Sequence, residues 1–126
     1  MPALTITLVA VGGALGALSR TGLTELFGGE TLAPETLAVT LTINTLGALL
    51  LSLLRRHAHL VPSPALLHAI SVGFLGSFTT WSAVIAISAL SYSAGHTVIA
   101  VVYLAITVVL GVGISVLARG PKAEAS

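Results

Sequence analysis

The chain has 126 residues, of which 56% are hydrophobic and only 7% are charged, and its mean hydropathy is +1.08. Soluble domains carry about a quarter charged residues, so this composition excludes a soluble globular domain and indicates an integral membrane protein. The sequence has no cysteine, which excludes disulfides and thiolate metal sites. The formal net charge of +1 indicates neither a nucleic-acid partner nor an acidic one.

The apolar residues form four segments that are long enough to cross a membrane. We predict helices over about residues 4–26, 36–54, 65–90 and 97–117, within a single domain that covers residues 1–126. No Asp, Glu, Lys or Arg occurs from His57 to Ala118. Because this run is far too long for one crossing of a ~30 Å hydrocarbon core, it must contain two crossings and a turn. The predicted fold class is an all-α integral membrane protein with four transmembrane helices.

Basic residues in the short loops predict the orientation of these four helices. One side of the membrane holds both termini and the second loop, with Arg55, Arg56, Arg119 and Lys122, whereas the other side has at most Arg20 among three glutamates. The positive-inside rule therefore places both termini in the cytoplasm. Only Met-Pro-Ala precedes the first apolar run, without a basic residue, so we expect no cleavable signal peptide.

Small residues and one arginine distinguish the first helix. Gly12 and Gly16 have GxxxG spacing, which favours close packing against the second helix, the third helix or another subunit. Arg20 lies about one turn from the end of this helix. Its side chain could extend to the membrane interface, or it could face a vestibule where its charge attracts anions; its position alone leaves both interpretations open.

Polar residues also occur within the second and fourth helices. Asn44 lies near the middle of the second helix, where interhelical hydrogen bonding is the default interpretation. Its amide could instead donate hydrogen bonds toward a polar pathway. In the fourth helix, polar or small residues recur at i+4 spacing, which favours a packing face but is also compatible with the wall of a polar path. These residues are Tyr103, Thr107, Gly111 and Ser115.

The stretch from Gly73 to Ser82, GFLGSFTTWS, combines glycines, hydroxyls and aromatic residues within the third apolar segment. A helix that only faces lipid has no need of this mixture. A helix that opens its backbone inside the membrane does, because its freed carbonyls can then meet an ion or water. We therefore predict that the third helix is broken in mid-membrane.

Several function classes are disfavoured by the positions of the polar residues. The histidines at 57, 59 and 68 lack convergent ligand spacing with carboxylates, so we expect no metal site there. No nucleophile–base pair can be assembled, and we predict that the chain is not an enzyme. A small multidrug exporter needs a carboxylate within the membrane, whereas the carboxylates here lie in loops or near termini: Glu25, Glu30, Glu35 and Glu124.

Three motifs, taken together and in order, resemble the CrcB/Fluc fluoride-channel family. They are Gly12-Gly13-x-x-Gly16-Ala17-x-x-Arg20, Asn44-x-x-Gly47 and Gly73-Phe74-x-Gly76-x-x-Thr79-Thr80-x-Ser82. The resemblance covers essentially the whole chain, including its length and its four predicted helices.

The resemblance implies a passive, fluoride-selective ion channel that lowers cytoplasmic fluoride in the plasma membrane of a prokaryote. It also implies an antiparallel dimer of two subunits, with two polar pores and a central structural sodium ion. Carried over to this sequence, the backbone carbonyls of Gly76 and Thr79 would bind the sodium ion. Asn44 would bind fluoride. A polar track would include Ser82, Tyr103 and Thr107, and Arg20 would lie near a vestibule.

The chain departs from the family pattern in two respects. Two phenylalanines usually follow the Thr-Thr pair and line the pores, but the corresponding residues here are Trp81 and Val84. Trp81 keeps an aromatic edge, whereas Val84 does not. The bias in Lys and Arg is also unexpected for a chain that inserts in both orientations. These departures indicate one half of a heterodimer, although a homodimer stays open; a non-conducting structural partner subunit is the alternative function.

Overall fold

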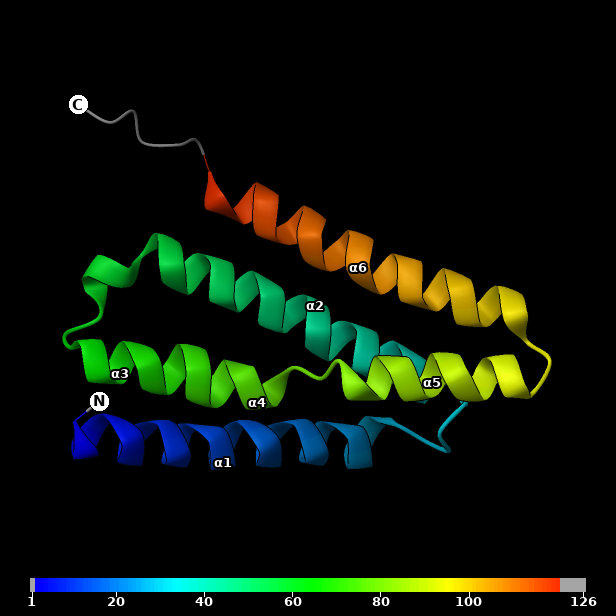
Figure 1. Cartoon of the computed structure of the whole chain (residues 1–126), viewed down its shortest axis with the longest axis horizontal. Coiled ribbons are helices and arrows are strands. Elements are labelled where there is room, and N and C mark those ends of the chain that lie inside the picture. Colours follow the sequence, from blue (N-terminus) through cyan, green and yellow to red (C-terminus); the bar gives the residue numbers. More distant parts are fainter. Residues whose placement is uncertain (1, 121–126) are drawn as a thin grey trace.

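The computed structural model describes residues 2–120, and every regular element in this range is a helix. Four helical segments are long and apolar enough to cross a membrane (Figure 1): α1 (Ala3–Phe27), α2 (Pro34–Arg56), the segment Pro64–Ser93 and α6 (Thr97–Arg119). The prediction of four such helices is confirmed, and each extends slightly beyond its predicted bounds. Lys122 and Glu124 lie outside the described residues.

Local sequence explains where the second and third segments begin. Pro34 opens α2, where its fixed φ suits the first helical turn and its missing N–H is not needed. Glu35 in the first turn and Arg55 and Arg56 in the last turn complement the helix dipole. At the start of the third segment, the Ser63 hydroxyl accepts a hydrogen bond from the Leu66 amide at 3.2 Å and so caps the helix.

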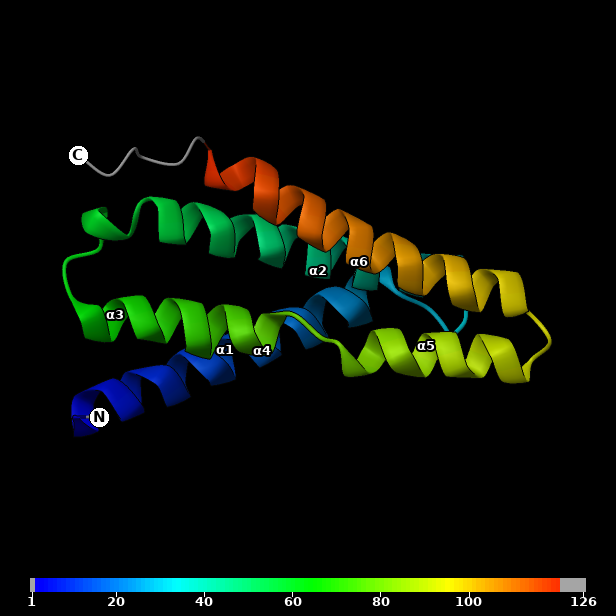
Figure 2. The same cartoon turned by 45° about the horizontal axis from the view of Figure 1, so that its top comes forward.

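The third segment is built from four helical pieces. After the short 3-10 turn η1 (Ala58–Leu60), α3 (Pro64–His68) runs into the π-helix η2 (Ala69–Leu75) and then into α4 (Gly76–Phe78). The helix resumes as α5 (Ser82–Ser93). Between them, Thr79 has an extended backbone (φ −80°, ψ 155°), and Figures 1 and 2 show a thin connection without helical turns at this point. Residues 79–81 therefore interrupt the segment.

Glycines bring α1 and η2 into backbone contact. A Cβ atom on Gly12 or Gly16 would collide with the carbonyl groups of Ala69 and Phe74, respectively, and one on Gly73 would lie 2.5 Å from the carbonyl oxygen of Val9. Only residues without a side chain allow helices to approach this closely. The GxxxG motif of the first helix thus packs against the third segment, one of the three partners that the sequence left open.

The other half of the bundle is formed by α6, which lies along α2 and α5 (Figures 1 and 2). A small apolar core joins these helices. Val84 (0% exposed), Ile87 and Tyr103 are buried there, against Leu37, Leu41 and Leu104. The starts of α1 and α3 lie at the same end of the bundle as the ends of α2 and α6 (Figure 1).

Candidate site at the interruption of the third segment

The interruption changes the hydrogen-bond partners of the helix backbone. In a continuous α-helix, the amides of residues 80 and 83 would donate to the carbonyls of residues 76 and 79. Here the Thr80 amide donates to Oδ1 of Asn44 at 2.7 Å, and the Ala83 amide donates to the hydroxyl of Thr80 at 3.1 Å. Side-chain oxygens thus replace backbone carbonyls as the acceptors for these two amides, and the carbonyls of Gly76 and Thr79 lose their helical donors.

Two other freed carbonyls gain side-chain donors. Nδ2 of Asn44 donates to the Thr80 carbonyl at 2.8 Å, and Nε of Arg20 donates to the Ser77 carbonyl at 3.1 Å. By contrast, the carbonyls of Gly76 and Thr79 gain no side-chain donor within residues 2–120, because Arg20 and Asn44 bond the neighbouring carbonyls instead. Carbonyl oxygens without their helical donors are suitable ligands for a hard cation, so the backbone of Gly76 and Thr79 is chemically compatible with the sodium ion, which stays a prediction.

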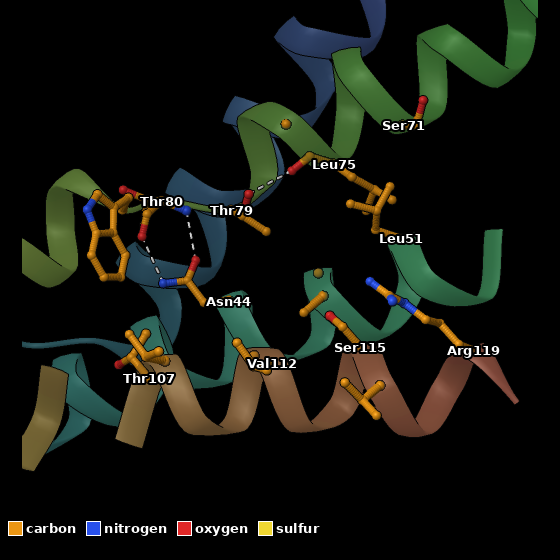
Figure 3. A pocket seen from close by; sticks show the side chains of 17 residues that line it. Asn44, Leu51, Ser71, Leu75, Thr79, Thr80, Thr107, Val112, Ser115 and Arg119 are labelled. Carbon is orange, nitrogen blue, oxygen red and sulfur yellow. Dashed lines mark hydrogen bonds between the residues drawn. The ribbon is translucent and has the colours of Figure 1, made fainter. Parts of the chain in front are cut away.

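Asn44 holds α2 against the interruption. Its amide pairs with both the N–H and the C=O of Thr80, which uses Oδ1 and one of the two hydrogens on Nδ2 (Figure 3). One N–H of Asn44 remains after these two bonds. One turn along α2, a Cβ atom on Gly47 would collide with the methyl group of Thr79. The sequence Asn44-x-x-Gly47 therefore fits closely against Thr79-Thr80, and the interhelical role expected for Asn44 is present.

A cavity of about 630 Å³, which we call the central groove, begins at this site. Asn44 and Thr80 lie at one end and Arg119 at the other (Figure 3). On α6, its wall includes three of the four residues of the i+4 stripe, namely Thr107, Gly111 and Ser115. Arg119, four residues after Ser115, lines it as well. The stripe therefore lines a groove over most of its length.

The structure separates the remaining candidate residues. Trp81 lines the central groove and is 55% exposed. The Ser82 hydroxyl lies 3.2 Å from that of Thr80 but is not part of the groove wall. Tyr103 and Val84 are buried in the apolar core. The hydroxyls of Tyr103 and Thr107 donate to the carbonyls of residues 37 and 103, at 3.0 and 2.8 Å.

Arg20 points into the bundle, since its Nε bonds the carbonyl of Ser77. The interpretation in which it extends to the membrane interface did not anticipate this contact. Arg119 was predicted only as a charge that sets the orientation of the helices. Its place in the groove could have been found from the i+4 series that starts at Tyr103, because 119 is the next member of that series.

Comparison with known proteins identifies the family. The model of the family described as "CrcB-like protein, Camphor Resistance (CrcB)" matches residues 7–119. The chain belongs to the CrcB family. The match spans all three motifs, so the family predicted from them is confirmed.

Three relatives with similar sequences bear names that state a function. The fluoride-specific ion channel FluC of Saccharophagus degradans is 37% identical over 117 residues, which cover 87% of this chain and 83% of the relative. FluC 2 of Symbiobacterium thermophilum is 38% identical, with coverage of 82% and 85%. FluC 1 of Desulfitobacterium hafniense is 39% identical, with coverage of 60% and 68%. This CrcB chain therefore aligns with most of the length of these channels.

Proposed function

We propose that the chain forms a passive, fluoride-selective channel that lowers cytoplasmic fluoride, as one subunit of an antiparallel dimer in a prokaryotic plasma membrane, with both termini in the cytoplasm. The observation that carries this proposal is the interruption at residues 79–81, where Asn44 and Arg20 hold the backbone open at one end of the central groove. The names of the relatives, fluoride-specific ion channels, support the choice of ion. We further propose that the interruption lies at mid-membrane depth.

The groove offers the kind of donors that fluoride needs. Fluoride is small and strongly hydrated, so hydrogen-bond donors must replace its water without trapping it. The second N–H of Asn44 and the indole N–H of Trp81 are such donors, and both residues line the groove. Among residues 2–120, no carboxylate lines the groove, so no fixed negative charge there opposes an anion.

We also propose a structural sodium ion at the interruption. The carbonyl oxygens of Gly76 and Thr79 would hold it, because their helical donors bond Asn44 and Thr80 instead. When bound, the ion would supply a positive charge beside the groove and neutralise these oxygens. Both effects would favour an anion that passes Asn44.

A second candidate is a non-conducting subunit that supports the pores of a related partner. Val84 favours it, because this side chain is fully buried against Ile87 and Tyr103 and presents no aromatic edge. The arginines at the ends of α2 and α6 also give one end of the bundle more positive charge, as expected for a subunit with one fixed orientation.

Fluoride efflux from liposomes tests both candidates. The purified chain is reconstituted alone, and fluoride release is followed with an ion-selective electrode against a chloride control. We expect fluoride efflux well above chloride efflux, and rapid efflux by the chain alone would refute an obligate heterodimer. If efflux requires a related partner, replacement of Asn44 in the complex decides between a conducting and a structural subunit. Absence of fluoride efflux under both conditions would refute the channel proposal.

A further inference from the structure

Three arginines surround a second cavity at the end of the bundle where α2 and α6 finish. The cavity has a volume of about 350 Å³ and is lined by Leu51, Ser52, Arg55, Arg56, Ser115 and Arg119. We call it the arginine cavity. It is contiguous with the central groove, because Leu51, Ser115 and Arg119 line both. Nothing in the proposed channel mechanism uses this cluster.

The helix geometry brings these charges together. Arg55 and Arg56 occupy the last turn of α2, and Arg119 is the last residue of α6. A Cβ atom on Gly120 would lie 2.9 Å from Cζ of Arg56, so this guanidinium group packs directly against the residue that follows α6. The two helix ends therefore converge on one space, and the three arginines line it while remaining exposed at the surface of the chain.

The charges in this space are not balanced by acidic groups in the described part of the chain. No carboxylate lines the arginine cavity within residues 2–120. Glu25, Glu30 and Glu35 belong to the other end of the bundle, around the connection from α1 to α2. Like charges that share a cavity repel one another, and a bound anion would relieve this repulsion.

We propose that the arginine cavity binds a phosphate group. Each guanidinium presents a planar pair of N–H donors that matches two oxygens of an oxyanion, and the hydroxyls of Ser52 and Ser115 add two further donors. A ligand that engages all three arginines must carry several oxygens, and a single fluoride ion has too few acceptor positions. The ends of two apolar spans also lie where lipid phosphates gather.

Two sources can supply the phosphate group, namely an anionic lipid headgroup and inorganic phosphate. Isothermal titration of the delipidated protein in maltoside micelles separates them. One arm uses sodium phosphate against sodium chloride at equal ionic strength. The other uses dihexanoyl phosphatidylglycerol against a dihexanoyl glycerolipid that lacks phosphate. Saturable binding in either arm supports the site and names the source, whereas binding in neither arm overturns the proposal.

Variants distinguish a built site from general attraction to positive charge. We expect Arg119→Gln and Arg55→Gln each to weaken phosphate binding roughly ten- to a hundredfold, because each removes charge-assisted hydrogen bonds. The matched control is His59→Glu, which lowers the net charge equally at the same end of the bundle but does not line the cavity. An equal loss of affinity in His59→Glu would overturn the proposal.

Arg56 also packs against the end of α6, so its loss could disturb folding. Arg→Lys variants at positions 55, 56 and 119 keep the charge, and the helix content of every variant is checked by circular dichroism. Lysine provides a point charge without the planar donor pair. We expect these variants to fold and to bind phosphate more weakly than the native chain. Unchanged affinity in all three would overturn the proposed recognition of an oxyanion.

Discussion

Replacement of Asn44 tests the central contact of the site. Asn44→Ala removes two hydrogen bonds, of 2.7 and 2.8 Å, that join α2 to Thr80. Interhelical hydrogen bonds in membrane proteins contribute about 0.6 kcal/mol on average and up to about 1.7 kcal/mol. Because Asn44 is only half-buried and faces a cavity that can admit water, we expect the variant to lose about 1–2 kcal/mol of unfolding free energy.

Asn44→Asp separates the contact from the charge. The carboxylate keeps an acceptor for the Thr80 amide, but it places a second oxygen against the Thr80 carbonyl. A negative charge about 4 Å from a passing fluoride would cost roughly 4 kcal/mol at an effective dielectric constant of about 20. We therefore expect fluoride efflux through Asn44→Asp to fall at least a hundredfold, and to fall further than efflux through Asn44→Ala, which adds no charge.

Equilibrium unfolding in mixed micelles and liposome efflux measure these two effects separately. Thr42→Ala is the matched control, because the Thr42 hydroxyl bonds only within α2, to the carbonyl of Ala38, and is exposed. This control should change stability by less than about 0.5 kcal/mol. If Asn44→Ala were as stable as the control, the double hydrogen bond to Thr80 would not be formed, and the explanation of the interruption would fail.

Three further substitutions test packing around the site. In the same unfolding assay, Gly16→Leu should lower the free energy of unfolding by about 1–3 kcal/mol or more, because the leucine side chain would collide with the η2 backbone. The control is Gly22→Leu, which should not destabilise the fold because the space around Gly22 is open. Arg20→Gln should cost about 1–3 kcal/mol through loss of the bond to the Ser77 carbonyl, and an unchanged stability would mean that this side chain points into water. Val84→Phe should cost about 1–3 kcal/mol by overpacking a fully buried position, and a gain in stability would reveal unfilled space there.

The four helices could be predicted from the sequence because length and hydropathy alone set membrane spans. The uncharged run from His57 to Ala118 requires two crossings, and Pro34, Ser63 and Pro64 mark helix starts through their local chemistry. Such signals depend only on neighbouring residues. They do not reveal which helix faces which, so the partner of the Gly12–Gly16 ridge stayed open until the structure placed it against η2.

The hydrogen bonds at the site could not be predicted from the sequence either, because they join residues on different helices. The composition of Gly73–Ser82 indicates that the backbone opens, but not which groups satisfy it. Arg20 and Ser77 are 57 residues apart, and Asn44 and Thr80 are 36 apart. A polar residue in an apolar helix indicates that a hydrogen-bond partner is needed. Which residue is the partner depends on how the helices cross in the folded chain. The π-helical geometry of η2 was likewise not predicted from the periodicity of the sequence.

Trp81 and Val84, which the sequence resemblance predicted to line the pores together, occupy different environments in this chain. Trp81 precedes the first residue of α5 and lies on the groove, 55% exposed, whereas Val84 is the third residue of α5 and is completely buried. Trp81 is the N-cap of α5, with helical backbone angles and a carbonyl that accepts a hydrogen bond from the Ile85 amide. The two residues are therefore helical neighbours, but only Trp81 lines the groove. A change of ring at Trp81 therefore alters the groove wall, and a change at Val84 alters the packing between α5 and α6. The valine at position 84 thus belongs first to the core of this subunit. Its nearest link to the groove wall is Tyr103, which shares that core and whose carbonyl accepts a hydrogen bond from the Thr107 hydroxyl.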